Sequence, residues 1–281
     1  RELCMILNIM WAQPLPLLYI MLFLHAANIF SFHAPKSKSI LRIQRYSAYE
    51  QYQRENAVQC VAEEKQDNIM LLSSGFIRDP VKRKWFKEQM TYLNIDNSLW
   101  KLAYIPTASM APDPESTRPP GQAKRKRRYE ARVKSKEISE ALGVNVEIID
   151  LEDYSDPDVL EQKLSAFQSV YVGGGNTFYL QHFSQQSGFS AIIPRLVKNG
   201  MIYIGVSAGA IIAGKTIATA FWKGLDSPDV VPGVDWSQLS AVQGMDLTDN
   251  KSFLPHYDES KWKQVFEVES KKLDHTCIAI K

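Results

Sequence analysis

Met201-Ile202-Tyr203-Ile204-Gly205-Val206-Ser207-Ala208-Gly209 is the stretch that decides the fold of this 281-residue chain. Its apolar start indicates a buried strand, and its small residues indicate a tight turn into a helix that continues to Gly214. Ser207 therefore stands between a strand and a helix, with a glycine two positions away on each side. This layout is typical of a nucleophile elbow, which presents a serine hydroxyl at the carboxyl end of a sheet. The alternative is a glycine- and serine-containing loop that matches the pattern by chance.

Outward from this stretch, short apolar runs alternate with helical patterns from Ile69 onward. The expected strands before the elbow are 69–72, 102–105, 144–149 and 169–172. The expected helices are about 81–93, a charged helix ending at 142, 156–167 and a helical region ending at 198. This alternation favours an α/β fold with a parallel sheet covered by helices on both faces. Ligands of such sheets bind beyond the carboxyl ends of the strands, where Ser207 is expected.

The composition is that of a globular domain and does not require a charged macromolecule as partner. The chain has 33 basic and 31 acidic residues, a formal charge of +2 and 45% apolar residues, so we expect no nucleic-acid partner. The basic run Lys124–Arg128 precedes several glutamates on one helical stretch, so we expect a solvated helix face there. Cys4, Cys60 and Cys277 show neither metal-ligand nor disulfide spacing, which predicts free thiols.

The first 68 residues are expected to serve targeting. The apolar run 15–27 has the length of a signal-peptide core and is shorter than the roughly 20 residues that span a bilayer. We therefore expect a cleaved signal in residues 1–31, a basic transit-like segment and linker in 32–68, and no stable membrane anchor. The junction 29–35 resembles the bipartite plastid-targeting sequences of algae, which predicts the secretory pathway and then a plastid, with secretion as the alternative. The catalytic domain is expected over 69–281, in a chain that begins at Arg1 and is expected to be truncated at both ends.

A second glycine-rich turn, Gly173-Gly174-Gly175-Asn176, directly follows the expected strand 169–172. A dinucleotide-binding loop would need a third glycine where Phe178 stands, and the Gly-Lys-Ser/Thr of a P-loop is absent. Two interpretations remain: a tight structural turn, or a backbone donor for an oxyanion close to Ser207.

A serine nucleophile needs a base and an acid that orients the base. His256 follows the apolar run 252–254 and Pro255, where a strand ends and a helix begins near Glu259. The other histidines lie in the expected signal, just after it, on a helix behind the glycine-rich turn, or in a charged terminal turn: His25, His33, His182 and His275. Spacing leaves the acid open, because five aspartates lie between Ser207 and His256: Asp226, Asp229, Asp235, Asp246 and Asp249.

Three segments in this order, 172–177, 204–210 and Pro255-His256-Tyr257, resemble the peptidase E family of serine peptidases, the α-aspartyl dipeptidases, to which cyanophycinase is related. Ile105-Pro106-Thr107-Ala108-Ser109 also fits, and the resemblance covers residues from about 69 to the end. It implies a three-layer, flavodoxin-like parallel sheet of the class I glutamine amidotransferase-like type. It further implies a Ser-His-Asp triad that needs no metal or organic cofactor. A glutamine amidotransferase itself would have cysteine in place of Ser207.

When the family's residue roles are assigned to the matching motif positions, the resemblance implies that Ser207 is the nucleophile and His256 is the base. It assigns oxyanion binding to the N–H groups of Ala208 and of Gly174 or Gly175. The family's acid corresponds best to Asp226 in Leu225-Asp226-Ser227-Pro228 if about four residues near 221–224 are inserted, and Asp229 is the second choice.

The implied activity is hydrolysis of short peptides by a dipeptidase, with small peptides beginning with Asp as the expected substrates. The family's recognition of such a substrate is expected to use a basic residue beyond the catalytic histidine. Here no arginine follows Arg195, and a lysine meets a carboxylate without the bidentate fork of arginine. A cyanophycinase-like hydrolase of aspartate–arginine polymer and a non-catalytic binding homologue are the alternatives. The sequence leaves the oligomeric state open.

Overall fold

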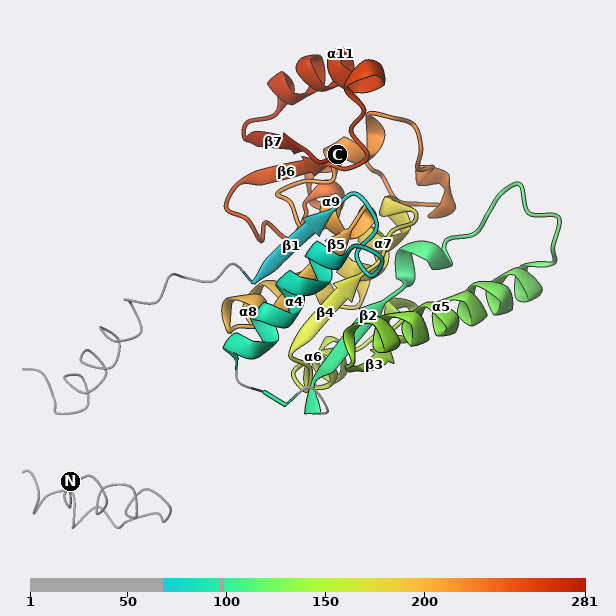
Figure 1. The fold of residues 1–281 in the computed structure, drawn as a ribbon. Coiled ribbons are helices and arrows are strands. Elements are labelled where there is room, and N and C mark those ends of the chain that lie inside the picture. Colours follow the sequence, from blue (N-terminus) through green and yellow to red (C-terminus); the bar gives the residue numbers. More distant parts are fainter. Residues whose placement is uncertain (1–67, 94, 97–98) are drawn as a thin grey trace, which may run out of the picture. The chain divides into compact units, whose positions relative to one another are not determined.

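The computed structural model of the chain describes residues 68–93, 95–96 and 99–281 (Figure 1). The two expected targeting segments, 1–31 and 32–68, lie outside these residues except for Asn68. The Asn68 side-chain amide donates hydrogen bonds to the carbonyl groups of Val197 and Met201, at 2.8 and 2.9 Å. Asn68 is thereby tied to the segment that leads into the elbow strand.

Within the described ranges, no helix combines the length and apolar character needed to cross a bilayer.

The described residues form a five-stranded parallel sheet in the order β1-β5-β4-β2-β3. Its strands are β1 (Ile69–Leu72), β2 (Lys101–Ile105), β3 (Asn145–Ile148), β4 (Ser169–Val172) and β5 (Ile202–Val206). From β2 the chain steps to β3 at one edge, whereas β4 and β5 lie on the other side of β2. The strand order therefore reverses between β2 and β4, and ligand sites of such sheets lie beyond the carboxyl ends near this reversal.

Helices connect consecutive strands. They are α4 (Pro80–Tyr92), α5 (Pro120–Leu142), α6 (Pro157–Leu164), α7 (Thr177–Gln186), α8 (Phe189–Lys198) and α9 (Ala208–Ile212), with the short 3-10 turns η3 (Thr107–Met110) and η4 (Leu151–Asp153). Helices α4 and α6 begin with proline directly after an aspartate cap, because proline needs no hydrogen-bond acceptor in the first turn and the aspartate accepts from the free N–H groups there. Helix α5 ends at Gly143, whose φ of 73° is left-handed.

Alternate residues of each strand face opposite layers of helices. In β2, Leu102 and Tyr104 belong to the core formed with α4 and α5, whereas Ala103 and Ile105 belong to the core formed with α6 to α9. In Figure 1, α4 and α5 lie in front of the strands. This period of two is what a sheet buried on both faces requires. The predicted three-layer α/β fold with a parallel sheet is confirmed.

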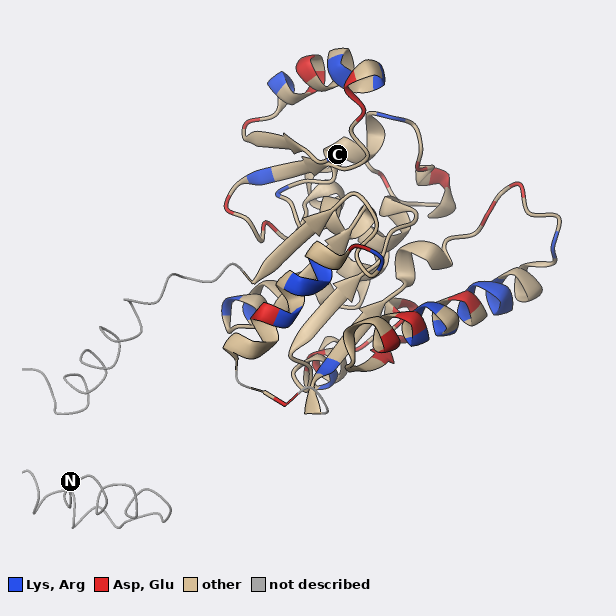
Figure 2. Ribbon diagram, in the orientation of Figure 1, with Lys and Arg blue, Asp and Glu red and all other residues tan. Residues whose placement is uncertain are grey.

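The basic run of α5 is paired with acidic residues of the same domain. Lys126 lies 3.2 Å from Glu130, and Arg128 donates a 2.8 Å hydrogen bond to Asp153 in η4. Blue and red alternate along this helix in Figure 2. Neighbouring acidic groups therefore offset part of the positive charge of the run.

The chain after α9 forms a group of short helices and strands beyond the carboxyl end of the sheet (Figure 1). It contains η5 (Ala218–Phe221), η6 (Pro228–Val230), α10 (Leu239–Val242), β6 (Lys251–Leu254), α11 (Glu259–Glu269), η7 (Ser270–Lys272) and β7 (Thr276–Ala279). Strands β6 and β7 form a separate parallel pair. The strand predicted before His256 and the helix predicted from Glu259 are both confirmed.

Candidate active site

Ser207 lies between β5 and α9 in a strained backbone conformation, with φ 53° and ψ −111°. A Cβ atom on Gly205 would come within 2.4 Å of the carbonyl oxygen of Gly209, and a Cβ atom on Gly209 would come within 2.3 Å of the carbonyl oxygen of Val172. The buried Tyr203 hydroxyl donates a 2.7 Å hydrogen bond to the Gly209 carbonyl. Side chains therefore cannot fit at either glycine, which is the physical reason for the sequence pattern around Ser207.

We expect Gly205→Ala to lower the free energy of unfolding by about 2 to 3 kcal/mol, because backbone atoms that block the new methyl group cannot move aside without disturbing the turn. The added Cβ would also meet the ring of Tyr203 at 2.8 Å. Urea unfolding followed by circular dichroism measures the change.

Gly121→Ala is the matched control, since a Cβ built at this position in the first turn of α5 meets no atom within 4 Å beyond its chain neighbours and the backbone of its own helix. Its free energy of unfolding should stay within about 0.5 kcal/mol of the wild type or rise slightly. Equal urea midpoints for the two variants would contradict the steric argument.

The structure brings Ser207 and His256 into direct contact. The serine Oγ and the histidine Nε2 lie 2.8 Å apart, within hydrogen-bond distance, although the residues are 49 positions apart in the chain. His256 follows β6 with a left-handed φ of 54°. Partial burial of the ring and the positive charge of Lys223 lower the pKa of His256 below 6.5, and the Asp226 carboxylate acts in the opposite direction. The imidazole is therefore held in the neutral form that can accept a proton.

The glycine-rich turn after β4 lies against Ser207. A Cβ atom on Gly174 would come 3.0 Å from the Cβ atom and 3.5 Å from the Oγ atom of Ser207. Gly175 has φ 138°, and a side chain there would collide with the backbone of Ala108. Among the described residues, no group accepts a hydrogen bond from the N–H of Gly174 or of Ala208. Two residues next to Ser207 thus have backbone N–H groups without an acceptor among the described residues.

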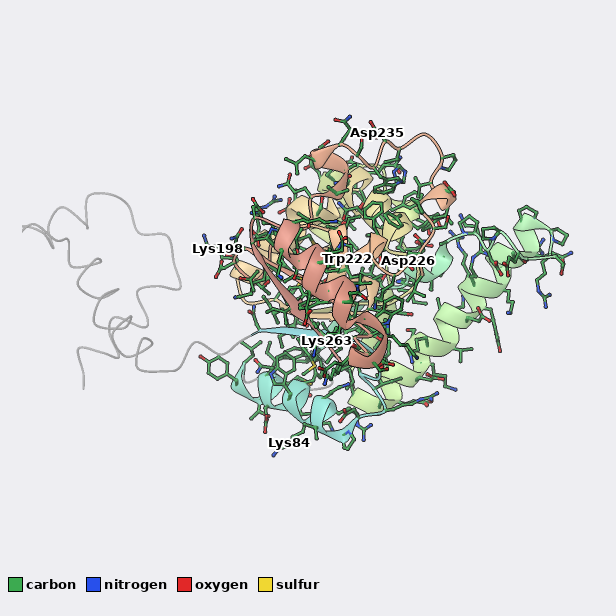
Figure 3. The ribbon with its side chains drawn as sticks, turned by 90° about the horizontal axis from the view of Figure 1, so that it is seen from above. Lys84, Lys198, Trp222, Asp226, Asp235 and Lys263 are labelled. Carbon is green, nitrogen blue, oxygen red and sulfur yellow. The ribbon has the colours of Figure 1, made fainter. Side chains whose placement is uncertain are left out.

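Asp226 is the sequence candidate for the acid whose charge acts on His256. Its Oδ2 atom accepts a 2.9 Å hydrogen bond from the N–H of Thr177 at the start of α7. No carboxylate of the described residues is hydrogen-bonded to the Nδ1 atom of His256. In Figure 3, Asp226 and Trp222 lie near the middle of the domain, whereas Lys84 and Lys198 lie at its margin. The Asp226 charge thus acts on His256 without a direct hydrogen bond from the carboxylate to the ring.

The other aspartates between Ser207 and His256 serve local turns. Three of them accept hydrogen bonds from groups within four residues: Asp229, Asp235 and Asp246. Asp249 has a left-handed φ of 54°. None of the four contributes to the pKa shift of His256. Of the two residues that the sequence motif allowed, Asp226 therefore has a charge that acts on His256, whereas Asp229 does not.

A second Ser-His-Asp array lies elsewhere in the domain, and sequence analysis missed it. The Oγ of Ser252 lies 2.7 Å from Nε2 of His275, and Nδ1 of His275 lies 2.7 Å from Oδ1 of Asp274. Ser252 is fully buried, its Oγ accepts from the N–H of Thr216, and the His275 side chain is 1% exposed. No peptide can reach this hydroxyl, so the array joins β6, β7 and the segment after α9 instead of forming a second site.

Two further residues near His256 also escaped prediction. The amino group of Lys223 donates hydrogen bonds to the carbonyl groups of Pro255 and His256. The hydroxyl of Ser73, just after β1, accepts from the N–H of His256 at 2.9 Å. Lys223 lies inside the segment 221–224 that was interpreted as an insertion, and a serine 183 positions from His256 gives no local signal.

The described residues contain no group of three or more His, Cys, Asp or Glu side chains arranged to hold a metal ion. Cys277 in β7 is a free thiol, and burial raises its pKa to about 12. The thiol is therefore protonated at neutral pH and is a poor nucleophile. Cys4 and Cys60 lie outside the described residues.

Curated proteins similar to this chain are peptidases. Lmo0363, an uncharacterized peptidase of Listeria monocytogenes, is 32% identical over 130 residues, which make up 46% of this chain and 59% of that protein. Peptidase E of Salmonella newport is 41% identical over 111 residues, which make up 39% of this chain and 44% of that protein. The chain thus spans about half the length of the curated relatives it matches.

Two solved structures are also similar. The structure of a peptidase from an acI-B1 Actinobacterium covers 76% of this chain and 79% of its own, with a TM-score of 0.50 and 17% identity. A Listeria monocytogenes structure solved as a candidate peptidase E covers 75% of this chain and 89% of its own, with a TM-score of 0.48 and 25% identity. Residues 69–280, from the start of β1 to just beyond β7, match peptidase family S51. The resemblance to peptidase E that the motifs indicated is therefore confirmed, and the chain belongs to peptidase family S51.

Proposed function

We propose that the chain is a serine-type peptidase that acts as a dipeptidase on short peptides. The observation that carries this proposal is the 2.8 Å hydrogen bond between Ser207 Oγ and His256 Nε2 at the carboxyl edge of the sheet. The family and the peptidase E relatives support the same class of reaction. A serine on a strained turn next to a neutral imidazole is the arrangement that serine hydrolysis needs.

The reaction proceeds in two halves. His256 Nε2 takes the hydroxyl proton while Ser207 Oγ bonds to the carbonyl carbon of the peptide, and the carbonyl electron pair moves onto its oxygen. Collapse of this intermediate breaks the C–N bond, and the imidazolium gives its proton to the departing amine. Water then attacks the acyl-serine by the same sequence, which releases the acid and restores both side chains.

The N–H groups of Gly174 and Ala208 stabilise the negative oxygen of the intermediate. Both belong to residues next to Ser207 and have no acceptor among the described residues. Each such donor contributes roughly 3 kcal/mol to transition-state stabilisation in enzymes of this kind. The Asp226 carboxylate stabilises the positive charge that forms on His256, which is the role of a triad acid.

The narrower substrate class is a peptide with an amino-terminal Asp. Lys223 is a half-buried cation beside His256, and its charge favours a substrate with a carboxylate near the scissile bond. The family resemblance predicts a basic residue beyond His256 that recognises the substrate carboxylate. We propose that Lys223, which precedes His256, supplies this positive charge instead.

A dipeptide panel tests this function on the full chain. We expect cleavage of Asp-Leu with a kcat/KM about fivefold above that of its isostere Asn-Leu, since one partly exposed charge pair is worth about 1 kcal/mol. N-acetyl-Asp-Leu controls for recognition of the free amino group.

Failure to cleave any dipeptide would contradict the proposed function, and equal rates for Asp-Leu and Asn-Leu would contradict the aspartyl preference. Turnover of an aspartate–arginine polymer without dipeptide cleavage would instead select the cyanophycinase-like reaction.

A further inference from the structure

We infer that Ser73 and Lys223 are positioning residues that hold the backbone of His256 so that its ring reaches Ser207. The expected effect of these residues on hydrolysis rests on the proposed function, whereas their expected effect on the position of the His256 ring does not. The two side chains come from segments far apart in the chain and bind opposite sides of the same residue.

Ser73 holds the N–H side of His256. It directly follows β1, is buried, and accepts a 2.9 Å hydrogen bond from the His256 N–H. Its hydroxyl proton is donated to the carbonyl of Ile280 at 2.7 Å. The Ile280 N–H in turn donates to the carbonyl of Leu254, the last residue of β6. One hydroxyl therefore joins the ends of β1 and β6 and the residue after β7 at the turn that contains His256.

Lys223 holds the carbonyl side. Its half-buried amino group donates to the carbonyl of Pro255, and it lies 3.5 Å from the carbonyl oxygen of His256. The same amino group lies 5.8 Å from the centre of the Trp262 ring in α11, within the range of a cation–π interaction. Lys223 is thereby fixed from both sides of the turn between β6 and α11.

Such a clamp is needed because of the backbone conformation of His256. A φ of 54° is unfavourable for a residue with a Cβ atom, and it persists only where neighbouring groups hold it. Hydrogen bonds to the N–H and to the carbonyl groups around the same Cα atom fix the direction of the side chain. Without them the turn can relax to ordinary dihedral angles, and a displacement of about 1 Å at a catalytic group can lower the rate by about 100-fold.

Lys223 has a second, electrostatic effect on the ring. The charged groups that act on His256 are Lys223, which lowers its pKa, and Asp226, which raises it. His256 is also in contact with two uncharged residues. They are Ser73, which follows β1, and Ser207, which follows β5. Removing the lysine charge therefore raises the pKa of His256. The acid limb of kcat/KM, which is the low-pH side of its pH profile, then moves to higher pH because the base must be deprotonated to act.

The first arm of the test compares Ser73→Ala with Ser74→Ala. Ser74 is the next residue and is exposed, so it is a matched control. For Ser73→Ala we expect kcat for Asp-Leu to fall by about 10- to 100-fold with KM changed less than about threefold. Ser73→Thr keeps the hydroxyl and should recover most of the loss, while Ser74→Ala should equal the wild type.

The second arm compares Lys223→Met with Lys223→Arg. Methionine keeps most of the stem and removes the charge, so we expect a lower kcat for both Asp-Leu and the uncharged Asn-Leu, and an acid limb at higher pH. Arginine keeps the charge and the donors, so the limb should stay in place. Lys215 pairs with Asp274 and is not among the groups that act on His256, so Lys215→Met is the control variant with an unchanged limb.

A third readout does not depend on hydrolysis. Crystal structures of Ser73→Ala and Ser74→Ala measure the Ser207 Oγ to His256 Nε2 distance, which should exceed 3.5 Å in the first variant alone.

Unchanged kcat, acid limb and distance in Ser73→Ala and Lys223→Met would overturn the clamp. If the wild type cleaves no dipeptide, the proposed function fails, and the distance together with NMR titration of the His256 ring in Lys223→Met still decides the clamp. If Ser73→Ala does not fold, the Lys223 variants decide it.

Discussion

Ser207→Ala is expected to lower kcat for dipeptide hydrolysis by about 10⁵-fold or more, because the atom that bonds to the carbonyl carbon is lost. Substrate binding and the free N–H groups of Gly174 and Ala208 remain, so KM should change little. Release of the amino-terminal residue, measured by chromatography over long incubations, gives the ratio. Unchanged hydrolysis by the variant would remove Ser207 from the mechanism.

Ser252→Ala is the matched control, because Ser252 and Ser207 are each hydrogen-bonded to a histidine in the part of the chain that the structure describes. Ser252 is fully buried, whereas Ser207 is half-buried at the edge of the sheet. The control should keep kcat within about threefold. It should lose about 1 to 2 kcal/mol of unfolding free energy, because His275 and the Thr216 N–H lose a buried partner.

Covalent labelling provides an independent measurement. A phosphonate reagent directed at reactive serines should modify Ser207 of the wild type and leave Ser252 unmodified, as read by peptide mass spectrometry. Labelling of Ser252 instead would mean that the buried array is the reactive one and would overturn the choice of nucleophile.

The parts of the fold that could be predicted are those that rest on local rules. The strands 69–72 and 169–172 were predicted to the residue, because each is a short apolar run between turn residues. The tight turn at Ser207 was predictable for a similar reason, since its geometry leaves room only for glycine at positions 205 and 209. Boundaries were less certain where apolar residues flank a strand: Val144 and Ile149 are buried but lie outside β3.

The unpredicted parts of the site depend on contacts between distant segments. The hydrogen bond from His256 to Ser73 and the bonds from Lys223 to the turn after β6 have no sequence pattern, because each needs two separate segments of the chain to meet. His275 was expected in a charged terminal turn, yet its side chain is 1% exposed, and its two ring nitrogens contact Ser252 and Asp274. Sequence order thus indicated the Ser207–His256 pair but not the residues that hold it.

Asp226→Asn is expected to lower kcat by about 10⁴-fold, the size of the loss observed when a triad aspartate is replaced. Asparagine can still accept the hydrogen bond from Thr177 N–H through its amide oxygen, so the turn should persist while the negative charge is lost. Because Asp226 raises the pKa of His256, its neutralisation lowers that pKa, and the acid limb of kcat/KM moves to lower pH. This direction is opposite to that expected for Lys223→Met. A general loss of packing would not move the two limbs in opposite directions.

Asp229→Asn separates the two carboxylates that the motif allows. Asp229 is exposed, and its hydrogen-bond partner is Ser227 in the same turn, so neutralising it should leave kcat within about threefold and the acid limb in place. A large loss in Asp229→Asn with a loss below tenfold in Asp226→Asn would assign the acid to Asp229. Losses below tenfold in both would mean that His256 acts without an aspartate, because no carboxylate of the described residues is bonded to its Nδ1 atom. We expect Asp226→Asn to lose activity and Asp229→Asn to keep it. The reason is that only the Asp226 charge, of these two carboxylates, acts on the His256 ring that contacts Ser207.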